Sequence, residues 1–509
     1  MQVCSALAPR LSLRTLLPEA EILGTDDLQI GRCVSDWRQV EPGDLFAALG
    51  SDLDKGGTGI PQAIARGAAA VLCQEAPAEA HVSVGARRAS PPAKRQGPGD
   101  ADVPLCLVSN AREAYGRICQ ALAGNPSLQL KVIGIAGDNG KTTASCLLAS
   151  VLLQAGGRVG LLGSLGYLDG QAIESATQPT PPADTLAALL ARMVANGCSH
   201  AVVEVSRRSL AESRLAGMQL DVACLTRGGK RGQSPFAGTA RRVLRTNGDC
   251  PLFPSLLEHL TPEGFAVLNA DDPASAACLR KLDGPALTVG IHKQAEIMGV
   301  LLEQCPSEQM FLLTAGSETV PVRTRMIGTQ HVYHCLTAAA VGLAYGIELM
   351  AVVRGLEAVE YVAGRLERIE CGQPFGVFVD NARTPAALAA CLEVLRKVTA
   401  GRLICVAAAR GDGDVRRLGQ TLDSTADQAV LTSDHLPDKD PGQAVAQVLE
   451  GFKDPRNVRI IADRAAAVGW ALAEAQPGDC VLLAGNGYRE GRAGPDDGQI
   501  ARQWLYERD

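Results

Sequence analysis

Three absences narrow the function of this chain of 509 residues. Its sixteen cysteines include no pair closer in sequence than Cys106 and Cys119, so the C-x-x-C spacing of zinc and redox sites is missing. No apolar run approaches the ~18 residues that a membrane-spanning helix needs. The net charge of −6 is only mildly acidic, which argues against a general nucleic-acid-binding protein. Scattered thiols in apolar surroundings suit a reducing compartment. We therefore expect a soluble, cytoplasmic protein with no membrane insertion and no nucleic-acid partner.

The length corresponds to about three domains of ~150 residues each. The composition changes, and a new series of strand-like runs begins, near Asn125 and again between Tyr361 and Gly364. The predicted domains are therefore residues 1–125, 126–361 and 362–509. Short apolar runs around one helical segment predict a small α/β domain at the start. Residues 78–103 are rich in Ala, Ser, Gly and Pro, and we expect them to form a solvated insertion.

A strand, a glycine-rich turn and a helix are predicted between residues 131 and 152. In such a turn, Gly137 and Gly140 allow backbone N–H groups to surround phosphate oxygens at the helix N-terminus. Lys141 is expected to reach the terminal phosphates, and Thr142 to offer its hydroxyl to Mg²⁺. The spacing departs from the strict Walker pattern, because Ile135 stands five residues before Gly140. The flanking strand and helix nevertheless favour a nucleotide-binding loop over an ordinary turn.

Further strands alternate with helices on both sides of position 362. Runs of strand length are residues 159–162, 200–205, 221–226, 265–269, 376–380, 402–407, 428–432 and 480–484. This alternation predicts mostly parallel sheets with a ligand at the carboxyl ends of the strands. Glu204 lies at such an end, where it either helps to hold Mg²⁺ or forms a structural salt bridge. The last third has no Rossmann-type phosphate fingerprint, so we expect it to complete a site on the middle domain.

The order of these motifs resembles that of the Mur ligases, and most closely the UDP-N-acetylmuramoyl-tripeptide synthetase type, over essentially the whole chain. The family's loop Gly-Thr-Asn-Gly-Lys-Thr-Thr is similar to Gly137 to Thr143, with Asp138 in place of the first Thr. Its other signatures resemble Asp36 to Arg38 with Trp37 in place of Ser, Pro42 to Phe46, Asn269 to Asp272, Gly364 to Glu367, and a degraded motif at Asp380. The resemblance implies the fold class α/β, in a three-domain architecture. These domains are a small N-terminal α/β domain, a central P-loop domain with a parallel sheet and a C-terminal Rossmann-like domain.

The resemblance also implies a chemistry. A substrate carboxylate takes the γ-phosphoryl group of ATP, and an amine attacks the acyl phosphate to give an amide. The implied cofactors are ATP and Mg²⁺, and the implied partners are a UDP-linked muramoyl peptide and an amino acid. The nucleotide-binding positions are Gly137, Asp138, Asn139, Gly140, Lys141, Thr142, Thr143, Asn269, Arg365 and Asp380. The catalytic positions are Lys141, Glu204, Arg207 and Arg208, the metal positions are Thr142 and Glu204, and the substrate positions are Asp36, Arg38, Thr180 and Arg214.

Several family positions are substituted in this chain. Arg207 and Arg208 replace a serine and a histidine, and the Asn-x-x-Asn pair of the central domain has become His331 and His334. The family's carbamoylated lysine falls near Asn247 or Asp249, neither of which forms a carbamate. The motif that reads the amino acid looks like Asp434 to Pro437, and a further one like Gly485 to Arg489, so recognition of diaminopimelate is unsupported. The Mg²⁺ site is therefore expected to be weakened.

The segment from Val205 to Arg245 holds nine Lys or Arg against Glu212 and Asp221. If it borders the phosphates, its cations compete with Mg²⁺; alternatively, most of them face solvent and only Arg207 and Arg208 matter. We expect an ATP-dependent ligase that adds an amino acid to a UDP-MurNAc-dipeptide, with weak or altered activity. The alternatives are a nucleotide-binding paralogue that acts as a scaffold or regulator of other cell-wall enzymes, and a ligase for another carboxylate.

Overall fold

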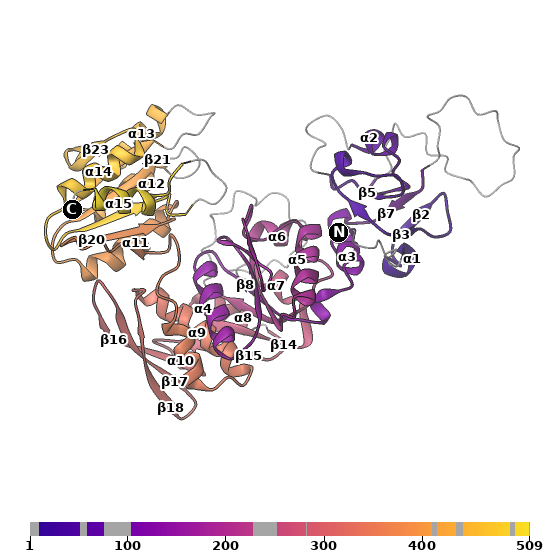
Figure 1. Cartoon of the computed structure of the whole chain (residues 1–509), viewed down its shortest axis with the longest axis horizontal. Coiled ribbons are helices and arrows are strands. Elements are labelled where there is room, and N and C mark those ends of the chain that lie inside the picture. The colour runs from indigo at the N-terminus through magenta and orange to yellow at the C-terminus, as the bar shows by residue number, and fades with distance from the viewer. Residues whose placement is uncertain are drawn as a thin grey trace, which may run out of the picture.

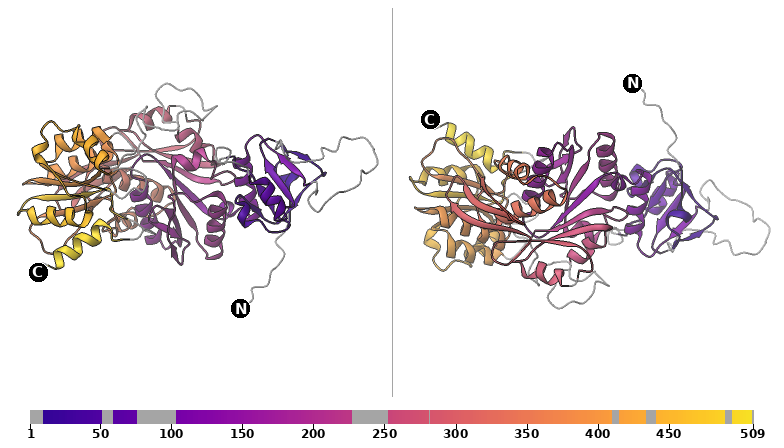
Figure 2. Two further views of the ribbon diagram at one scale, coloured as in Figure 1. Left: turned by 90° about the horizontal axis from the view of Figure 1, so that it is seen from above. Right: turned by 90° about the horizontal axis from the view of Figure 1, so that it is seen from below.

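The computed structural model describes residues 10–50, 59–75, 103–226, 252–280, 282–409, 415–433, 441–488 and 494–507. Most of the predicted insertion at 78–103, both candidate positions at Asn247 and Asp249, the segment 434–437 and Arg489 lie outside these residues. The chain forms a row of three α/β domains, with the N-terminal domain at one end and the C-terminal domain at the other (Figure 1). Figure 2 shows the same order from above and from below.

The N-terminal domain is built on a five-stranded sheet of order β2-β7-β6-β5-β4. Its strands are β2 (Glu21–Leu23), β4 (Cys33–Val34), β5 (Leu45–Ala47), β6 (Ala70–Cys73) and β7 (Leu105–Leu107), and the short pair β1 (Leu11–Ser12) and β3 (Gln29–Ile30) lies beside it. Helix α2 (Ile60–Ala65) covers one face, and α1 (Leu13–Leu16) and α3 (Ala111–Leu122) cover the other. The apolar face of α3 also packs on Ala183 and Ala187 of α5 (Ala183–Ala195), which joins this domain to the next.

The central domain contains an eleven-stranded sheet of order β11-β10-β9-β12-β8-β13-β14-β15-β16-β17-β18. Its strands are β8 (Lys131–Ala136), β9 (Val159–Gly163), β10 (Gly166–Leu168), β11 (Ile173–Glu174), β12 (His200–Val205), β13 (Leu220–Leu225), β14 (Leu260–Asn269), β15 (Ala286–Gly290), β16 (Ile297–Gln304), β17 (Gln309–Ala315) and β18 (Glu318–Thr324). The run from β9 to β16 is parallel, and both margins are antiparallel. The carboxyl ends of β8, β12 and β13 therefore meet at one edge.

Side chains alternate between the two faces of this sheet, as the pleat of a strand requires. Ile133 and Ile135 of β8 pack with α4 (Lys141–Gln154), α9 (Thr329–Ala344) and α10 (Leu349–Glu357). Val132 and Ala136 pack on the opposite side with α5, α7 (Leu252–Leu257) and α8 (Pro273–Leu279). Because both faces are covered, the central strands are continuous apolar runs, and this is why the sequence shows them so clearly.

Helix α4 is enclosed by the sheet, α9 and α10. Its apolar residues Leu147, Leu148 and Val151 are almost completely buried. Helix α10 approaches closely at Gly355, where an added Cβ would lie 2.6 Å from the Cα of Val151. The helix that begins at the glycine-rich turn is therefore held rigidly by its neighbours.

The C-terminal domain has a six-stranded sheet of order β19-β20-β24-β21-β22-β23. Its strands are β19 (Glu367–Arg368), β20 (Gly376–Asp380), β21 (Leu403–Ala409), β22 (Gln428–Ser433), β23 (Val458–Ile460) and β24 (Cys480–Ala484), all parallel except β19. One face carries α11 (Pro385–Val398), α12 (Val415–Thr425) and α13 (Pro441–Leu449), and the other α14 (Arg464–Glu474) and α15 (Asp497–Tyr506). The α/β fold class and the strands predicted here are confirmed. Within the described ranges, no helix combines the length and apolar character needed to cross a bilayer.

Candidate functional site

The glycine-rich turn connects β8 to α4 as predicted. Strand β8 ends at Ala136, and α4 begins at Lys141. Gly137 and Gly140 have φ values of 145° and 86°, which a residue with a side chain rarely adopts. An added Cβ at Gly140 would also lie 2.0 Å from Nε2 of His334. The glycines are therefore required both by the backbone turn and by the close approach of α9.

Lys141 follows this turn directly as the first residue of α4. Its Nζ donates a hydrogen bond to the carbonyl oxygen of Gly137 at 2.7 Å. Burial lowers the pKa of Lys141, while the carboxylates of Glu204 and Asp138 act in the opposite direction. The ammonium group is thus held over the loop, within reach of any anion that the loop amides bind.

Glu204 is 1% exposed at the carboxyl end of β12. Its Oε1 accepts the N–H of Ser164 at 2.9 Å, and its Oε2 accepts the hydroxyls of Ser164 at 3.0 Å and Thr142 at 3.2 Å. Among the described residues no Lys or Arg forms an ion pair with it, so the salt-bridge alternative is not supported there. A buried carboxylate next to two hydroxyls is an oxygen set that fits Mg²⁺ bound together with phosphate oxygens.

The two consecutive arginines have different surroundings. Arg207, the first residue of α6 (Arg207–Ala211), donates from Nε to Oδ1 of Asp138 at 2.6 Å. Arg208 instead pairs with Glu212 at 2.8 Å, and its side chain is 67% exposed. Asp138 and Arg207 both depart from the family motifs, and their side chains form an ion pair beside the glycine-rich loop. The expectation that both arginines border the phosphates therefore finds geometric support for Arg207 alone.

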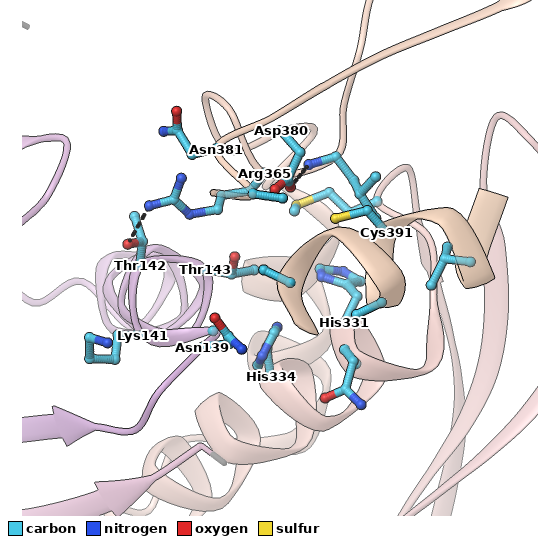
Figure 3. Close-up of a pocket in the computed structure, with 18 of the residues that line it drawn as sticks. Asn139, Lys141, Thr142, Thr143, His331, His334, Arg365, Asp380, Asn381 and Cys391 are labelled. Carbon is cyan, nitrogen blue, oxygen red and sulfur yellow. Dashed lines mark hydrogen bonds between the residues drawn. The ribbon is translucent and has the colours of Figure 1, made fainter. Parts of the chain in front are cut away.

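The C-terminal domain contributes the other wall of the site. Arg365 donates to the hydroxyl of Thr142 at 3.1 Å, which links residues of two domains. Asp380, at the end of β20, accepts the N–H of Leu366 at 2.8 Å. Burial raises the pKa of Asp380, and the guanidinium of Arg365 opposes this effect. Figure 3 shows that the Arg365 side chain extends toward Thr142, with Asp380 close to it.

A cavity of about 310 Å³ lies between these walls. The cavity is lined by residues predicted for the site, namely Asp138, Asn139, Gly140, Lys141, Thr142, Thr143, Glu204, Arg365 and Asp380. Apolar residues also line it; they precede α9 or belong to α11, namely Met326, Ile327, Ala387, Ala390 and Val394. His331 and His334 of α9 also line it. The sequence showed these histidines as substitutions but did not place them, although their i, i+3 spacing puts them on one face of a helix.

Some predicted residues lie away from the cavity. Asn269 is buried at the end of β14, where its Oδ1 accepts the N–H of Asp271 at 2.9 Å. Thr180 donates its hydroxyl to the carbonyl oxygen of Glu204 at 2.6 Å, and Arg214 donates to the carbonyl oxygen of Thr180 at 2.6 Å. Thr180 and Arg214 thus support the strand end that carries Glu204. A nucleotide contact of Asn269 finds no support in this geometry.

Asp36 and Arg38 lie in the N-terminal domain. Their side chains form an ion pair at 3.4 Å, and the guanidinium of Arg38 lies 4.7 Å from the centre of the Trp37 ring. Trp37 also contacts Gly59, where an added Cβ would lie 2.8 Å from its ring. Trp37, which replaces the family's serine, therefore lies on the same surface as the two predicted substrate residues.

The fold and the cavity define a three-domain α/β protein with a phosphate loop at a domain joint. Comparison with known proteins gives the same class. Residues 135–342 match the model of the Mur ligase middle domain, and residues 364–487 match that of the Mur ligase glutamate ligase domain.

Two relatives span nearly the whole chain. The UDP-N-acetylmuramoyl-L-alanyl-D-glutamate–2,6-diaminopimelate ligase of Bacillus licheniformis is 31% identical over 95% of this chain and 96% of its own length. The UDP-N-acetylmuramyl-tripeptide synthetase of a Roseiflexus species is 32% identical over 90% of both. The chain belongs to the Mur ligase family and groups with its UDP-N-acetylmuramyl-tripeptide synthetases.

Solved structures agree in fold. A UDP-N-acetylmuramoyl-L-alanyl-D-glutamate–2,6-diaminopimelate ligase superposes with a TM-score of 0.66 at 23% identity, covering 98% of this chain and 99% of that one. MurF ligase of Thermotoga maritima in complex with ADP superposes with a TM-score of 0.60 at 17% identity, covering 94% of this chain and 98% of that one. The three-domain architecture expected from the resemblance is confirmed.

Proposed function

We propose that this protein is an ATP-dependent ligase that adds an amino acid to a UDP-MurNAc-dipeptide through an acyl phosphate, with weak or altered turnover. The observation that carries the proposal is the cavity in which Lys141, Thr142 and Glu204 face Arg365 and Asp380 of the next domain. The relatives that span the chain bear the names of ligases for this class of substrate. An ADP complex of a protein with the same fold supports the assignment of the loop to nucleotide.

The chain's own residues would act as follows. The loop amides and Lys141 bind the terminal phosphates, and Thr142 and Glu204 hold Mg²⁺, which neutralises charge on the phosphate oxygens when it is bound. The substrate carboxylate attacks the γ-phosphorus, the bond to the bridging oxygen breaks, and ADP leaves. The amine of the incoming amino acid then attacks the acyl carbon, phosphate leaves and the nitrogen loses a proton.

Weak turnover is proposed because the charged residues predicted to lie near the phosphates differ from those of the family. Arg207 stands where the family has a serine and is neutralised by Asp138 rather than left free. Glu204 keeps its hydroxyl partners, whereas the family's carbamoylated lysine has no counterpart in the sequence at Asn247 or Asp249. The loss of one preorganised electrostatic contact costs roughly a hundredfold in rate. Several such losses need not add, because catalytic residues act as a unit.

The test is phosphate release by the full chain with ATP, Mg²⁺, UDP-MurNAc-dipeptide and a panel of amino acids. We expect slow release that depends on both the dipeptide and one class of amino acid, and that disappears in Lys141→Ala. Lys397→Ala is the matched control, because Lys397 is an exposed lysine of α11 that does not line the cavity. Release that ignores the muramoyl dipeptide but requires another carboxylate would contradict the substrate assignment.

A second candidate is a nucleotide-binding paralogue without ligase activity that acts among other cell-wall enzymes. The Asp138–Arg207 pair at the mouth of the loop favours it, since it keeps a cation close to the phosphates without freeing it for transition-state charge. This candidate predicts nucleotide binding by calorimetry together with no amide product in single-turnover experiments. Amide formation that collapses in Arg207→Ala would instead identify Arg207 as a cation that serves the γ-phosphoryl group.

A further inference from the structure

The turn between β9 and β10 packs directly against the carboxylate of Glu204. It has only two loop residues, Ser164 and Leu165, because Gly163 and Gly166 on either side are already paired with each other. Gly166 has a φ of 148°, and an added Cβ at Gly163 would lie 2.2 Å from Oε1 of Glu204. The two glycines therefore allow a tight turn to approach the carboxylate closely.

One loop residue of this turn binds Glu204, and the next one binds the C-terminal domain. Ser164 donates its N–H to Oε1 of Glu204 at 2.9 Å and its hydroxyl to Oε2 at 3.0 Å. The carbonyl oxygen of Leu165 accepts the hydroxyl of Tyr488 at 3.2 Å. Because Ser164 and Leu165 are consecutive residues of a two-residue loop, neither shifts without moving the other. The contact with Tyr488 therefore affects the position of the carboxylate.

Tyr488 is itself held at the domain joint. The side-chain oxygen of Asn381, the residue after β20, accepts the N–H groups of Gly487 at 2.9 Å and of Tyr488 at 3.2 Å. The backbone of Gly364 packs on the same segment, where an added Cβ would lie 2.9 Å from the carbonyl carbon of Gly487. The backbone of Tyr488 is thus fixed in the C-terminal domain, while its hydroxyl reaches the central domain.

The second hydroxyl that binds Glu204 is also contacted from the C-terminal domain. Thr142 donates to Oε2 of Glu204 at 3.2 Å and accepts a hydrogen bond from Arg365 at 3.1 Å, which Figure 3 shows. A threonine hydroxyl has one proton and two lone pairs. These two bonds orient the hydroxyl and leave one lone pair for a cation. Docking of the C-terminal domain therefore acts on both sides of Glu204.

We propose that Tyr488 is a positioning residue for Glu204, and that its hydroxyl sets how tightly the site holds a divalent cation. The inference rests on the proposed nucleotide and Mg²⁺ site. Removing a group that directly orients a metal ligand lowers metal affinity by about ten- to a hundredfold. Tyr488 acts one residue further out through a neutral hydrogen bond, whose loss corresponds to about three- to tenfold. Binding effects are reciprocal, so a bound cation also strengthens the docking of Tyr488.

Calorimetric titration of the full chain with the β,γ-imido analogue of ATP, in Mg²⁺ and in EDTA, tests the proposal. The ratio of the two dissociation constants measures the affinity gained from Mg²⁺, and an unfolded fraction of the protein does not change it. In Tyr488→Phe this gain should fall about three- to tenfold, whereas the dissociation constant in EDTA should stay within about twofold. Tyr506→Phe is the matched control and should change neither value, because Tyr506 is 66% exposed in α15 and does not line the cavity.

A double-mutant cycle shows whether the effect passes through the turn. Ser164→Ala should lower the gain from Mg²⁺ about tenfold, since it removes a hydrogen bond to the carboxylate. In that background, Tyr488→Phe should cause a smaller further loss, within about twofold, because changes in one hydrogen-bond network are not additive. Losses that multiply independently would show that Tyr488 does not act through Ser164, and would overturn the inference.

The other results decide separate points. An unchanged gain from Mg²⁺ in Tyr488→Phe, or an equal loss of affinity with and without Mg²⁺, would overturn the inference and leave the nucleotide site intact. Tyr488→Met, which also lacks the hydroxyl, covers the case in which the phenylalanine variant does not fold. Failure of the wild-type chain to bind nucleotide in either buffer would instead overturn the proposed function itself.

Discussion

At the scale of single residues, the site differs from the family's motifs by substitutions that compensate each other. Asp138 adds a negative charge to the glycine-rich loop, and the guanidinium of Arg207 pairs with it. Both side chains are partly exposed, 31% for Asp138 and 40% for Arg207. Such a pair contributes at most about 1 kcal/mol to stability. Its main effect is therefore on the electrostatic potential that a bound triphosphate experiences.

Replacing Asp138 by the family's threonine should strengthen nucleotide binding. The substitution removes a negative charge at the loop and frees Arg207 for the phosphates, so the dissociation constant of ATP should fall about three- to tenfold at low salt and less at high salt. Asp138→Asn, which keeps the shape, should give a similar gain. Arg207→Ala should weaken binding, because it leaves the carboxylate unpaired. Calorimetry at two ionic strengths measures this, and unchanged affinity in both Asp138 variants would contradict it.

The buried histidines also make stability depend on pH. Burial lowers the pKa of His331 to about 3 and that of His334 to about 4, against about 6.5 in the unfolded chain. Between these values the unfolded state binds more protons, so stability is complete above about pH 6.5 and falls as the pH decreases. Each histidine contributes a slope of about 1.4 kcal/mol per pH unit. Urea unfolding at pH 7, 6 and 5 should show a shallower loss in the His331→Asn, His334→Asn double variant. Equal slopes in the two proteins would refute this.

At the scale of elements, the packing of α4 decides how rigid the phosphate loop is. Helices α9 and α10 enclose α4, and the contact with α10 is made at a glycine. An added methyl group at Gly355 would lie 2.6 Å from the Cα of Val151, a backbone atom that cannot move without shifting the helix. Strain at this contact would therefore reach the loop through α4.

Gly355→Ala should destabilise the protein by about 1–3 kcal/mol, as overpacking in a close-packed core does. Nucleotide affinity should fall with it, since Lys141 and Thr142 stand on the first turn of α4. Gly284→Ala serves as the control, because nothing lies within 4 Å of an added Cβ there. Chemical unfolding and nucleotide titration of both variants measure the two effects. A Gly355→Ala protein as stable as the Gly284→Ala protein would contradict the proposed role of this contact.

The elements also show how far the sequence predicts the fold. Strands β8, β12 and β24 are buried on both faces, and their continuous apolar runs locate them within a residue of the observed bounds. The antiparallel margin from β16 to β18 was missed. Val300 and Leu302 are apolar although they are 47% and 53% exposed. The sequence there therefore lacks the alternation of apolar and polar residues that would mark a strand with one buried face. Residues 138–143 of the cavity were predicted because they form one contiguous motif, and Glu204, Arg365 and Asp380 were predicted from a strand end and from the family resemblance. The residues of α9 and α11 were not, because tertiary packing alone brings His331 and Val394 to the loop.

At the scale of the whole molecule, the cavity belongs to two domains at once. Arg365 reaches the hydroxyl of Thr142 at 3.1 Å, and the hydroxyl of Tyr488 donates to the carbonyl oxygen of Leu165 at 3.2 Å. Among the described residues, these polar contacts and the packing of Ile327 in the core of the C-terminal domain join the two domains at the site. Interfaces of this kind permit relative domain motion, and a ligand that contacts both walls stabilises the closed arrangement.

Nucleotide should therefore protect one domain joint from proteolysis and not the other. We predict cleavage near residues 125–126 and 361–364, where the composition restarts. ATP with Mg²⁺ should slow cleavage at the second joint several-fold, because phosphates held by Lys141 also face Arg365 across the cavity. Cleavage at the first joint should keep its rate, since α3 and α5 pack there without contributing to the cavity. Arg365→Ala should lose most of the protection, whereas Arg368→Ala, a change in the neighbouring strand β19, should retain it. Mass spectrometry of timed digests identifies the cut sites, and equal protection of both joints by nucleotide would show that the ligand does not bridge the two domains.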